Sequence, residues 1–334
     1  MRKPRIAITL GDVAGIGPEV TARALADPRV VSVCDAAVIG DPLVVARAVD
    51  ISETSQRVVE SPTLEAAFDE TDGRQIGVWN PSGQPLSEVP VGIVSGPAGQ
   101  AAHDWLVAAI DAARAGRIDA ITTAPLSKAA LHSAGLKYPG HTEILAERCG
   151  VKQFAMMLYV PSGGAIRGPA GLGIAHVTLH TSIASVPGLL STAKIEGTIG
   201  LVDDFMRRLG CKSPRIGVCA LNPHAGEEGL FGDEESRIIA PAVAKCPNAA
   251  GPFPTDTLIR RAVHGEFDGL VAMYHDQGHI ALKLIAFGTA VNVTLGLPIV
   301  RTSPSHGTGF DIAWQGRAEA TGMIEAILAA ARLC

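Results

Sequence analysis

The chain has 334 residues, of which 47% are hydrophobic, 18% charged and only 4% aromatic. This balance is typical of a folded protein and excludes a disordered one, which would be poor in apolar residues and rich in charge. The length exceeds one core of about 150 residues and predicts two domains. The net charge is −5 and no run of Lys and Arg exceeds two residues, so the basic surface that nucleic-acid binding needs is missing.

The start of the chain and the cysteines bear on its location. The apolar run that begins at Ile6 stops at Gly11, too early for the ~7–15 apolar residues of a secretory signal. No apolar stretch approaches the ~20 residues of a membrane span. The six cysteines form no CxxC pair, so we expect reduced structural thiols. These features predict a cytoplasmic protein that binds no membrane.

Short apolar runs rich in β-formers alternate with Ala-rich helical runs. The expected strands lie at residues 6–10, 118–122, 154–160, 172–178, 216–221 and 270–274. The expected helices lie at residues 20–26, 97–115, 125–133, 144–149, 189–209 and 319–333. A glycine-rich loop at 162–171 joins the third and fourth strands. This alternation predicts mostly parallel sheets covered by helices.

The fold class expected from this pattern is α/β, with two α/β/α domains. No long linker separates them, and domains without a linker often share an interleaved chain, with the active site in the cleft between them. We expect both ends of the chain, 1–124 and 288–334, to form the first domain. Residues 125–287 would form the second.

Histidines stand close to the ends of three predicted strands: His224, His275 and the pair His176 and His180. Ligands of open α/β sheets bind beyond the carboxyl ends of the strands. Three imidazoles there favour a catalytic metal with positions left open for a substrate oxygen. Spacing does not decide between His176 and His180, which we expect on one face of a strand. The alternative is that each histidine is a hydrogen-bonded structural residue.

A second group of residues suggests an anionic ligand. The segment GHTE, with His141 and Thr142, precedes a predicted helix and so lies at its positive end. The alternative for Thr142 is a plain helix N-cap. Further on, Lys283, Asn292 and Arg301 recur in otherwise apolar sequence. Buried charge needs a partner, which a substrate phosphate and carboxylate would supply, and structural salt bridges are the alternative.

Two glycine-rich turns are candidates for a cofactor. The turn GDVAGIGPE, with Gly11 and Gly15, joins a strand to a helix but is neither GxGxxG nor a P-loop. The turn HGTGFDIA precedes the last helix, and its candidate residues are His306, Gly307, Thr308 and Asp311. If one domain contains both ends of the chain, both turns meet at one dinucleotide, where glycines admit its backbone closely. The alternative is that both clusters only make tight turns.

A family resemblance is carried by long segments that follow one another along the chain. They are GDVAGIGPE (11–19), TTAPLSKAAL (122–131), GHTE (140–143), HVTLH (176–180), LNPHAGE (221–227), GPFPTDT (251–257), YHDQGHIALK (274–283), VNVTLGLPIVRTS (291–303) and HGTGFDIA (306–313). In these segments the sequence resembles the 4-hydroxythreonine-4-phosphate dehydrogenase family of pyridoxal phosphate biosynthesis. The first and last segments also resemble isocitrate and isopropylmalate dehydrogenases, which implies their fold and NAD(P) binding without a Rossmann fingerprint.

The resemblance implies a site for one divalent metal: Zn, Co, Ni, Mg or Mn. The implied ligands are His180, which it chooses over His176, with His224 and His275, the last supplied by the other subunit of a homodimer. The second domain would carry these ligands and the dimer contacts, and the first would face the nucleotide. The implied substrate contacts are His141, Thr142, Lys283, Asn292 and Arg301.

The implied reaction is the NAD- or NADP-linked oxidation of 4-phosphooxy-L-threonine at C3. The β-keto acid formed would lose CO₂ and give 3-amino-2-oxopropyl phosphate. The metal would polarise the hydroxyl and stabilise the developing enolate. His141 and Lys283 are the candidate catalytic residues, and Lys283 would either hold the phosphate or shuttle a proton.

Several positions depart from the family's usual pattern. The family has Pro at Val13, Asn at Ser127, Val-Asp at 304–305 and Gly at Trp314, and the loop 162–171 resembles an insertion. These departures leave open a sugar-acid phosphate, such as D-threonate or D-erythronate 4-phosphate. The intact GHTE and VNVTLGLP segments disfavour an aromatic cis-diol. A non-catalytic metabolite-binding homologue would have lost the metal set, whereas all three histidines remain.

Overall fold

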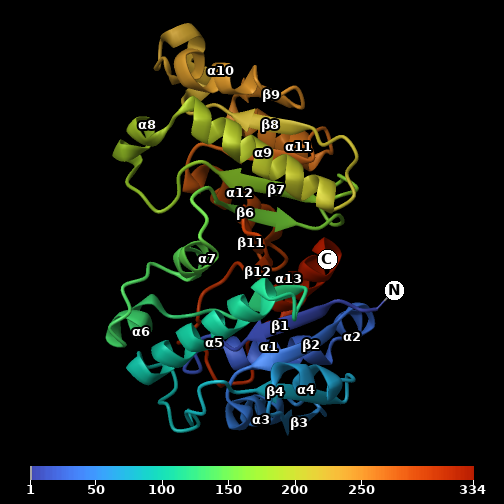
Figure 1. Cartoon of the computed structure of the whole chain (residues 1–334). Coiled ribbons are helices and arrows are strands. Elements are labelled where there is room, and N and C mark those ends of the chain that lie inside the picture. Colours follow the sequence, from blue (N-terminus) through green and yellow to red (C-terminus); the bar gives the residue numbers. More distant parts are fainter. Residues whose placement is uncertain (1) are drawn as a thin grey trace. The chain divides into compact units, whose positions relative to one another are not determined.

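Strands and helices alternate along the chain in the computed structural model, which describes residues 2–334 (Figure 1). The predicted α/β class with mostly parallel sheet is therefore confirmed. The chain divides into two compact units. The first contains the residues up to Val151 together with Leu297–Cys334, and the second is Lys152–Gly296.

The first unit contains a parallel sheet with the strand order β3-β4-β2-β1-β5-β12. Its strands are β1 (Arg5–Thr9), β2 (Asp35–Ile39), β3 (Arg57–Glu60), β4 (Gln75–Trp79), β5 (Ala120–Thr123) and β12 (Val300–Pro304). Every residue of β5 and β12 is buried. Strands buried along their whole length are covered on both faces, as in a helix-flanked parallel sheet.

The helices of the first unit include the five expected from the sequence and three more, Pro28–Val33, Pro42–Ile51 and Leu64–Asp69, that were not expected. They are α1 (Gly17–Ala26), α2 (Pro28–Val33), α3 (Pro42–Ile51), α4 (Leu64–Asp69), α5 (Gly96–Arg114), α6 (Lys128–Ser133), α7 (His141–Cys149) and α13 (Thr321–Leu333). Asp41 and Ser95 cap α3 and α5 by accepting backbone N–H groups of the first turn, and proline stands at the start of both helices. Figure 1 shows α5 lying along the strands of this unit.

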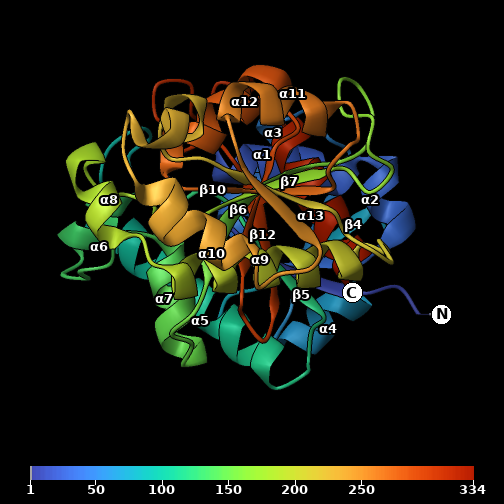
Figure 2. The same ribbon diagram turned by 90° about the horizontal axis from the view of Figure 1, so that it is seen from above.

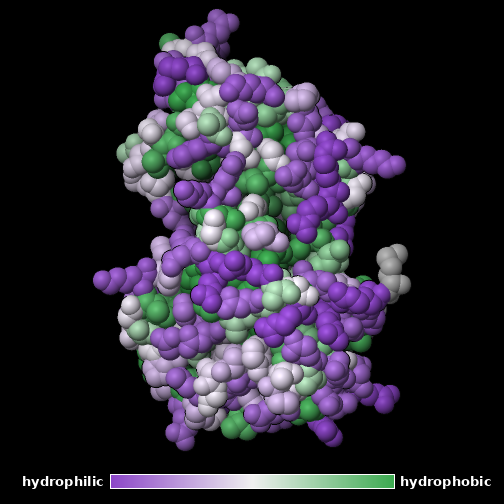
Figure 3. Space-filling model, viewed as in Figure 1, coloured by the Kyte–Doolittle hydropathy of each residue, from purple (hydrophilic) through white to green (hydrophobic). Residues whose placement is uncertain are grey.

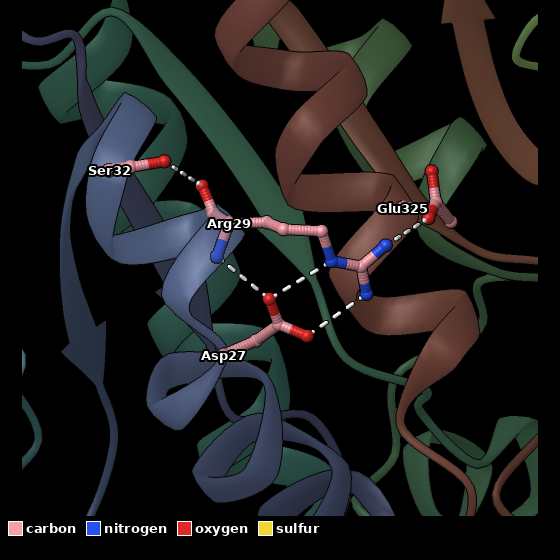
Figure 4. A network of polar contacts seen from close by, with 4 residues as sticks. All are labelled: Asp27, Arg29, Ser32 and Glu325. Atoms are coloured by element: carbon pink, nitrogen blue, oxygen red, sulfur yellow. Dashed lines mark hydrogen bonds and ion pairs between the residues drawn. The ribbon is translucent and has the colours of Figure 1, made fainter.

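The two ends of the chain are joined within the first unit. Figure 4 shows Arg29, which forms a two-point contact with Asp27 and reaches Glu325 of α13 at 3.2 Å. Hydrogen bonding to Arg29 lowers the pKa of the Asp27 carboxyl. Exposed ion pairs contribute only about 0–1 kcal/mol. The main attachment of α13 is therefore its apolar face, which includes Met323 and Ile327 and packs on β12 and β5.

The second unit contains a mixed sheet with the strand order β11-β6-β7-β10-β8-β9. Its strands are β6 (Ala155–Val160), β7 (Leu172–His176), β8 (Ile216–Cys219), β9 (Ala249–Phe253), β10 (Gly269–Ala272) and β11 (Val291–Leu295). β6 is antiparallel to both of its neighbours, whereas β7, β10, β8 and β9 are parallel. The carboxyl ends of β7, β10 and β8 consequently meet at one edge of the sheet.

Helices cover both faces of this second sheet. They are η1 (Ile183–Ser185), α8 (Val186–Leu189), α9 (Thr192–Arg208), η2 (Pro223–Gly229), η3 (Glu235–Ile239), α10 (Ala240–Val243), α11 (Thr255–Val263) and α12 (His275–Ala286). Figure 2 shows α11 and α12 on one side of β7 and β10, with α9 on the other. The loop 162–171 belongs to this unit's core, because Ile166 is buried in it and Arg167 donates to the Val263 carbonyl.

The bounds of the units lie later in the chain than the predicted 124/125 and 287/288. Helices α6 and α7 pack on α5, which brings the segment up to Val151 into the first unit. Strand β11 pairs with β6, so residues up to Gly296 stay in the second. Both differences come from contacts between segments far apart in sequence, which local patterns do not reveal.

Hydrophilic side chains cover much of the face drawn in Figure 3, with smaller apolar areas between them. Within residues 2–334 no helix combines the length and the apolar character needed to cross a membrane.

The contact between α5 and α6 leaves no room for a side chain at Gly99. A Cβ there would lie 2.2 Å from the Ala130 carbonyl oxygen. We expect Gly99→Ala to lower the free energy of unfolding by about 1–3 kcal/mol, the usual cost of overpacking, although alanine is the better helix former. Urea denaturation measures this change.

Gly200 of α9 provides the matched control, because a Cβ there would meet no atom within 4 Å. Gly200→Ala should raise the free energy of unfolding by about 0.5–1 kcal/mol. Equal changes of the same sign in both variants would contradict this account of the α5–α6 contact.

Candidate functional site

The carboxyl edge of the second unit's sheet carries a group of histidines. His176 is the last residue of β7 and pairs with Ala272 of β10. The chain leaves β10 and begins α12 at His275, so these two strand ends bring His176 and His275 together. Their ring centroids lie 6.1 Å apart.

Four imidazole rings form this cluster, which we call the histidine cluster: His176, His180, His275 and His279. The ring centroids of His180 and His275 are 5.4 Å apart, and those of His176 and His279 are 4.7 Å apart. His279 stacks on His275 at 3.8 Å, with an angle of 11° between the planes. Three of these residues are candidates from the sequence and His279 is not, although the segment YHDQGH shows a second histidine one helical turn after His275.

The spacing of His180 and His275 fits two ligands of one metal ion. Imidazoles that bind Zn²⁺ at about 2.1 Å in tetrahedral directions have ring centroids roughly 5 Å apart. His275 donates from Nδ1 to the Asp276 carboxylate at 2.7 Å, which leaves Nε2 as the ligand atom. This separation is measured within one chain, and the expectation that His275 is supplied by the other subunit of a homodimer stays a prediction.

His224 is not part of the histidine cluster. It lies in η2, where five consecutive residues from His224 to Glu228 have left-handed φ values, including 52° at His224. Its side chain is exposed, and Nδ1 donates to the Glu227 carboxylate at 3.0 Å, again leaving Nε2 open. Residues 2–334 contain no group of three or more His, Cys, Asp and Glu side chains placed to hold a metal. The structure thus brings together two of the three expected ligands.

His176 and His180 do not share a strand face, so that prediction is wrong. β7 ends at His176. His176 is 2% exposed and donates from Nδ1 to the Met156 carbonyl at 3.1 Å, whereas His180 lies beyond the strand and is exposed. Burial lowers the pKa of His176 to about 4. His176 is therefore a hydrogen-bonded structural residue, and His180 remains the candidate metal ligand of the two.

A cationic group lies in the first unit. Arg301 of β12 is 2% exposed and donates to the Thr123 hydroxyl at 2.6 Å. Burial lowers the pKa of Arg301 to about 9, so the guanidinium stays charged at neutral pH. Burial lowers the pKa of His141 well below its usual range, and the charge of Arg301 adds to this effect. His141 is therefore a neutral imidazole close to a buried cation.

Thr142 is not the N-cap of its helix, because α7 begins at His141 and its N-cap is Gly140. That alternative is wrong. Thr142 lies instead in the first turn, where backbone N–H groups have no acceptor within the helix and suit an anion.

Lys283 and Asn292 lie in the second unit. On α12, His275, His279 and Lys283 follow one another at intervals of four residues and so share one face of the helix. The Lys283 charge helps to lower the pKa of His279, which places the ammonium close to the histidine cluster. The Asn292 carbonyl oxygen is buried and has no hydrogen-bond partner within residues 2–334. A ligand N–H or O–H group would satisfy it.

The two glycine-rich turns meet, as expected. Ile16 donates its backbone N–H to the Thr308 carbonyl at 2.8 Å, and a Cβ on Gly15 would lie 2.6 Å from the same oxygen. A Cβ on Gly11 would lie 2.3 Å from the Pro125 carbonyl oxygen. Packing of the chain itself thus explains Gly11 and Gly15. By contrast, a Cβ on Gly307 would meet nothing within 4 Å, and the cofactor role of Gly307, His306, Thr308 and Asp311 stays a prediction.

Two departures from the family pattern contact each other at these turns. Trp314 donates its indole N–H to the Val13 carbonyl at 2.8 Å, and its backbone N–H to Glu19. The Arg47 guanidinium lies over the indole, 4.3 Å from the ring centroid. Trp314 has φ 59°, a conformation that favours glycine. Its contacts with Val13 and Arg47 compensate for this strain.

Comparison with known proteins agrees with the resemblance. The family model described as pyridoxal phosphate biosynthetic protein PdxA matches residues 32–330. A 4-hydroxythreonine-4-phosphate dehydrogenase of Geobacter metallireducens is 43% identical, over 99% of this chain and 96% of that protein. A D-threonate 4-phosphate dehydrogenase of Salmonella typhimurium is 41% identical over the full length of both chains.

A solved structure extends this comparison to the fold. The crystal structure of a 4-hydroxythreonine-4-phosphate dehydrogenase from Klebsiella pneumoniae has a TM-score of 0.84 and 40% identity, over 99% of each chain. Similarity over the whole length, in both sequence and fold, shows that the chain belongs to the PdxA family of dehydrogenases.

Proposed function

We propose that the chain is a metal-dependent, NAD(P)-linked dehydrogenase that oxidises 4-phosphooxy-L-threonine at C3 and releases CO₂, giving 3-amino-2-oxopropyl phosphate. The observation that carries the metal requirement is the 5.4 Å separation of the His180 and His275 rings, with Nε2 of His275 left open by Asp276. The substrate class comes from the names of relatives that match the whole chain.

His180 and His275 would hold the metal, and His224 would complete the set if the exposed turn η2 brings it to them. When bound, the metal would polarise the C3 hydroxyl as a Lewis acid, and the nicotinamide would accept the C3 hydride. Asp276 keeps the His275 proton on Nδ1 and so fixes its ligand nitrogen.

The proton released from the C3 hydroxyl would pass to the neutral amine form of Lys283, which becomes an ammonium, because this residue lies on the face of α12 that also carries His275. Oxidation places a ketone β to the carboxylate, so the bond to that carboxylate breaks and its electron pair passes into an enolate. Return of the proton from Lys283 to the enolate carbon completes the reaction.

Arg301 and Thr142 would bind the anionic part of the substrate, and His141 would bind a neighbouring O–H or N–H group of it. A phosphate or carboxylate beside Arg301 would compensate the desolvation of this buried guanidinium. Neutral His141 has one N–H group, which a hydrogen bond to the Ala124 backbone occupies, so its other ring nitrogen can accept a hydrogen bond from a substrate O–H or N–H group without adding a charge next to Arg301. In the second unit, Asn292 would accept a hydrogen bond from the substrate through its buried carbonyl oxygen.

The cofactor, NAD or NADP, is assigned to the two glycine-rich turns of the first unit. Support comes from the contact between Ile16 and Thr308, which brings the turns together, and from the open space beside Gly307. His306 and Asp311 belong to the same turn as Gly307.

A second candidate substrate is D-threonate 4-phosphate, because a relative of that name matches the full length of the chain. Threonate carries a hydroxyl where threonine carries its amino group, at C2. The residues assigned above interact with the carboxylate, the phosphate and the C3 oxygen, which both compounds share. The two candidates therefore require the same site.

A panel of substrates tests this proposal. Protein, NAD or NADP and either 4-phosphooxy-L-threonine or D-threonate 4-phosphate are mixed, and the reduced nicotinamide is followed by its absorbance, with and without a chelator. We expect turnover of one substrate, its loss with chelator and its return on adding Zn²⁺ or Co²⁺. Turnover that survives complete metal removal would contradict the metal requirement, and no turnover of either compound would contradict the substrate class.

The variant Arg301→Met tests the anion site. Loss of a desolvated charge-assisted contact costs about 2–5 kcal/mol, so KM for the phosphorylated substrate should rise by roughly 30-fold or more, while KM for the nicotinamide stays nearly unchanged. Steady-state kinetics measures both constants.

Arg148→Met is the matched control, because among residues 2–334 its exposed guanidinium bonds only the Asp111 carboxylate at the surface, and the Arg114 side chain bonds the Arg148 backbone carbonyl, which the substitution keeps. An unchanged substrate KM in the Arg301 variant would show that Arg301 does not bind the substrate.

A homodimer is part of this proposal. α12 exposes Ile280, Leu284 and Phe287, with 65%, 86% and 68% of each residue accessible. Their spacing of four and three residues forms one apolar row on the helix. Such a row indicates a protein contact surface, and a second copy of the chain is the partner that the family resemblance implies. Lys283 lies beside this row, so dimerisation would affect the position of this proposed catalytic residue.

Leu284→Glu should therefore convert the dimer to a monomer and lower kcat, because a charge cannot be buried without a partner. Light scattering after gel filtration measures the mass. Leu43→Glu, at an exposed leucine of α3 in the first unit, should leave the mass unchanged. A Leu284→Glu protein with the mass of the native form would show that the apolar row is not the dimer contact.

A further inference from the structure

The segment from His275 to His279 contains two residues whose purpose the proposed reaction does not explain. His275 is assigned to the metal and Asp276 to its orientation. Gln277 holds the start of the helix through hydrogen bonds to Met273, Ala220 and Thr255. Gly278 and His279 remain, together with the buried His176.

Hydrogen bonds determine where His176 and His279 carry their protons. The Met156 carbonyl can only accept, so His176 donates to it from Nδ1 and its Nε2 holds a lone pair. His279 lies with Nδ1 3.2 Å from that Nε2, so His279 must donate from Nδ1. Both rings are therefore neutral and share one tautomer, and the direction of donation runs from His279 to His176 to the backbone of β6.

Gly278 is required by this arrangement. A Cβ at this position would lie 2.6 Å from Nε2 of His176 and 2.7 Å from the Ile174 side chain. Because Gly278 has no side chain, the ring of His176 can lie against α12. In that position the buried His176 ring accepts the hydrogen bond of His279 and holds it in place.

The stacking of His279 on His275 excludes it as a ligand of the same ion. The two rings are nearly parallel, at 11°, with centroids 3.8 Å apart. Ligand lone pairs lie in the ring planes, so nitrogens of parallel stacked rings cannot converge on one metal at about 2.1 Å. The His279 ring instead covers one face of His275 and restricts rotation of that ring about its side-chain bonds.

We propose that His279 and His176 are positioning residues for the metal ligand His275: the ring of His279 holds the His275 ring with its Nε2 open for the metal, and His176 holds His279. This inference rests on the proposed metal site. Asp276 fixes the His275 ring at its edge through Nδ1, and His279 fixes it at its face. Together they pre-organise the ligand before the metal arrives, which reduces the entropy lost on binding.

Two substitutions of His279 separate its ring from its hydrogen bond. His279→Asn keeps an N–H donor for His176 and removes the ring. His279→Phe keeps a flat ring against His275 and removes the donor. His264→Asn is the matched control, because His264 follows α11, is exposed and bonds only the Arg260 carbonyl among residues 2–334.

Co²⁺ binding to the full-length chain, measured by competition with a chromophoric chelator and by the visible absorption of bound Co²⁺, gives the readout. Loss of an outer-shell partner usually weakens metal binding about 10–100-fold. We expect that loss, with an altered Co²⁺ spectrum, for His279→Asn, recovery to within a few-fold for His279→Phe, and native affinity for the control. Far-UV circular dichroism and melting confirm that each variant is folded.

The outcomes distinguish this inference from the proposed metal site. If the native chain binds no Co²⁺, the metal assignment is wrong and the positioning role with it. If the native chain binds Co²⁺ and His279→Asn binds equally well, or His279→Phe fails to recover, only the positioning role is wrong. ¹⁵N NMR of the metal-free protein gives an independent check, since both rings should carry their proton on Nδ1, and a proton on Nε2 of His279 would overturn the proposal.

Discussion

Gln277 joins three segments of the second unit at the edge of its sheet where the histidines gather. Its amide nitrogen donates to the Ala220 carbonyl, just beyond β8, at 2.6 Å and to the Thr255 hydroxyl at the start of α11 at 2.9 Å. Its amide oxygen accepts from Met273, just beyond β10, at 2.7 Å. Both donated hydrogen bonds of the Gln277 amide nitrogen and one accepted bond of its oxygen fix the first turn of α12 against two strand ends. The orientation of His275, and of His279 and Lys283 along the same face, depends on this attachment.

The two units carry different kinds of chemistry. The second unit holds neutral imidazoles, kept neutral by burial at His176 and His279, whose pKa values fall to about 4 and about 3. The first unit holds a buried cation, Arg301, beside an imidazole that is also neutral at physiological pH. The neutral rings of His176 and His279 add no positive charge beside the proposed metal ligand His275, and a buried guanidinium suits a phosphate or carboxylate. This division agrees with a phosphorylated hydroxy acid as the substrate of a PdxA-family dehydrogenase.

The glycines of this chain show that a sequence motif does not reveal which neighbour excludes a side chain at each glycine. Gly11 and Gly15 stand in a turn that resembles a cofactor-binding segment, yet the carbonyl oxygens of Pro125 and Thr308 occupy the space of a Cβ at these two positions. Gly278 belongs to neither glycine-rich turn, and its missing side chain leaves room for His176. In each case the neighbour that excludes a side chain is more than 100 residues away, so only the folded chain shows it.

The sequence by itself determined the α/β class, the places of long helices such as α5 and α13, and the residue types of the site. These follow from local rules: the periodicity of apolar residues, the geometry of proline, and the tendency of polar residues to follow buried strands. Only the tertiary structure decided that α6 and α7 belong with the first unit, that His176 is buried while His180 is exposed, and that His279 stacks on His275. Those results depend on which strands pair and in what register, for example Ala272 beside His176. Pairing between distant strands is fixed by the packing of the whole core, and for that reason no local segment encodes it.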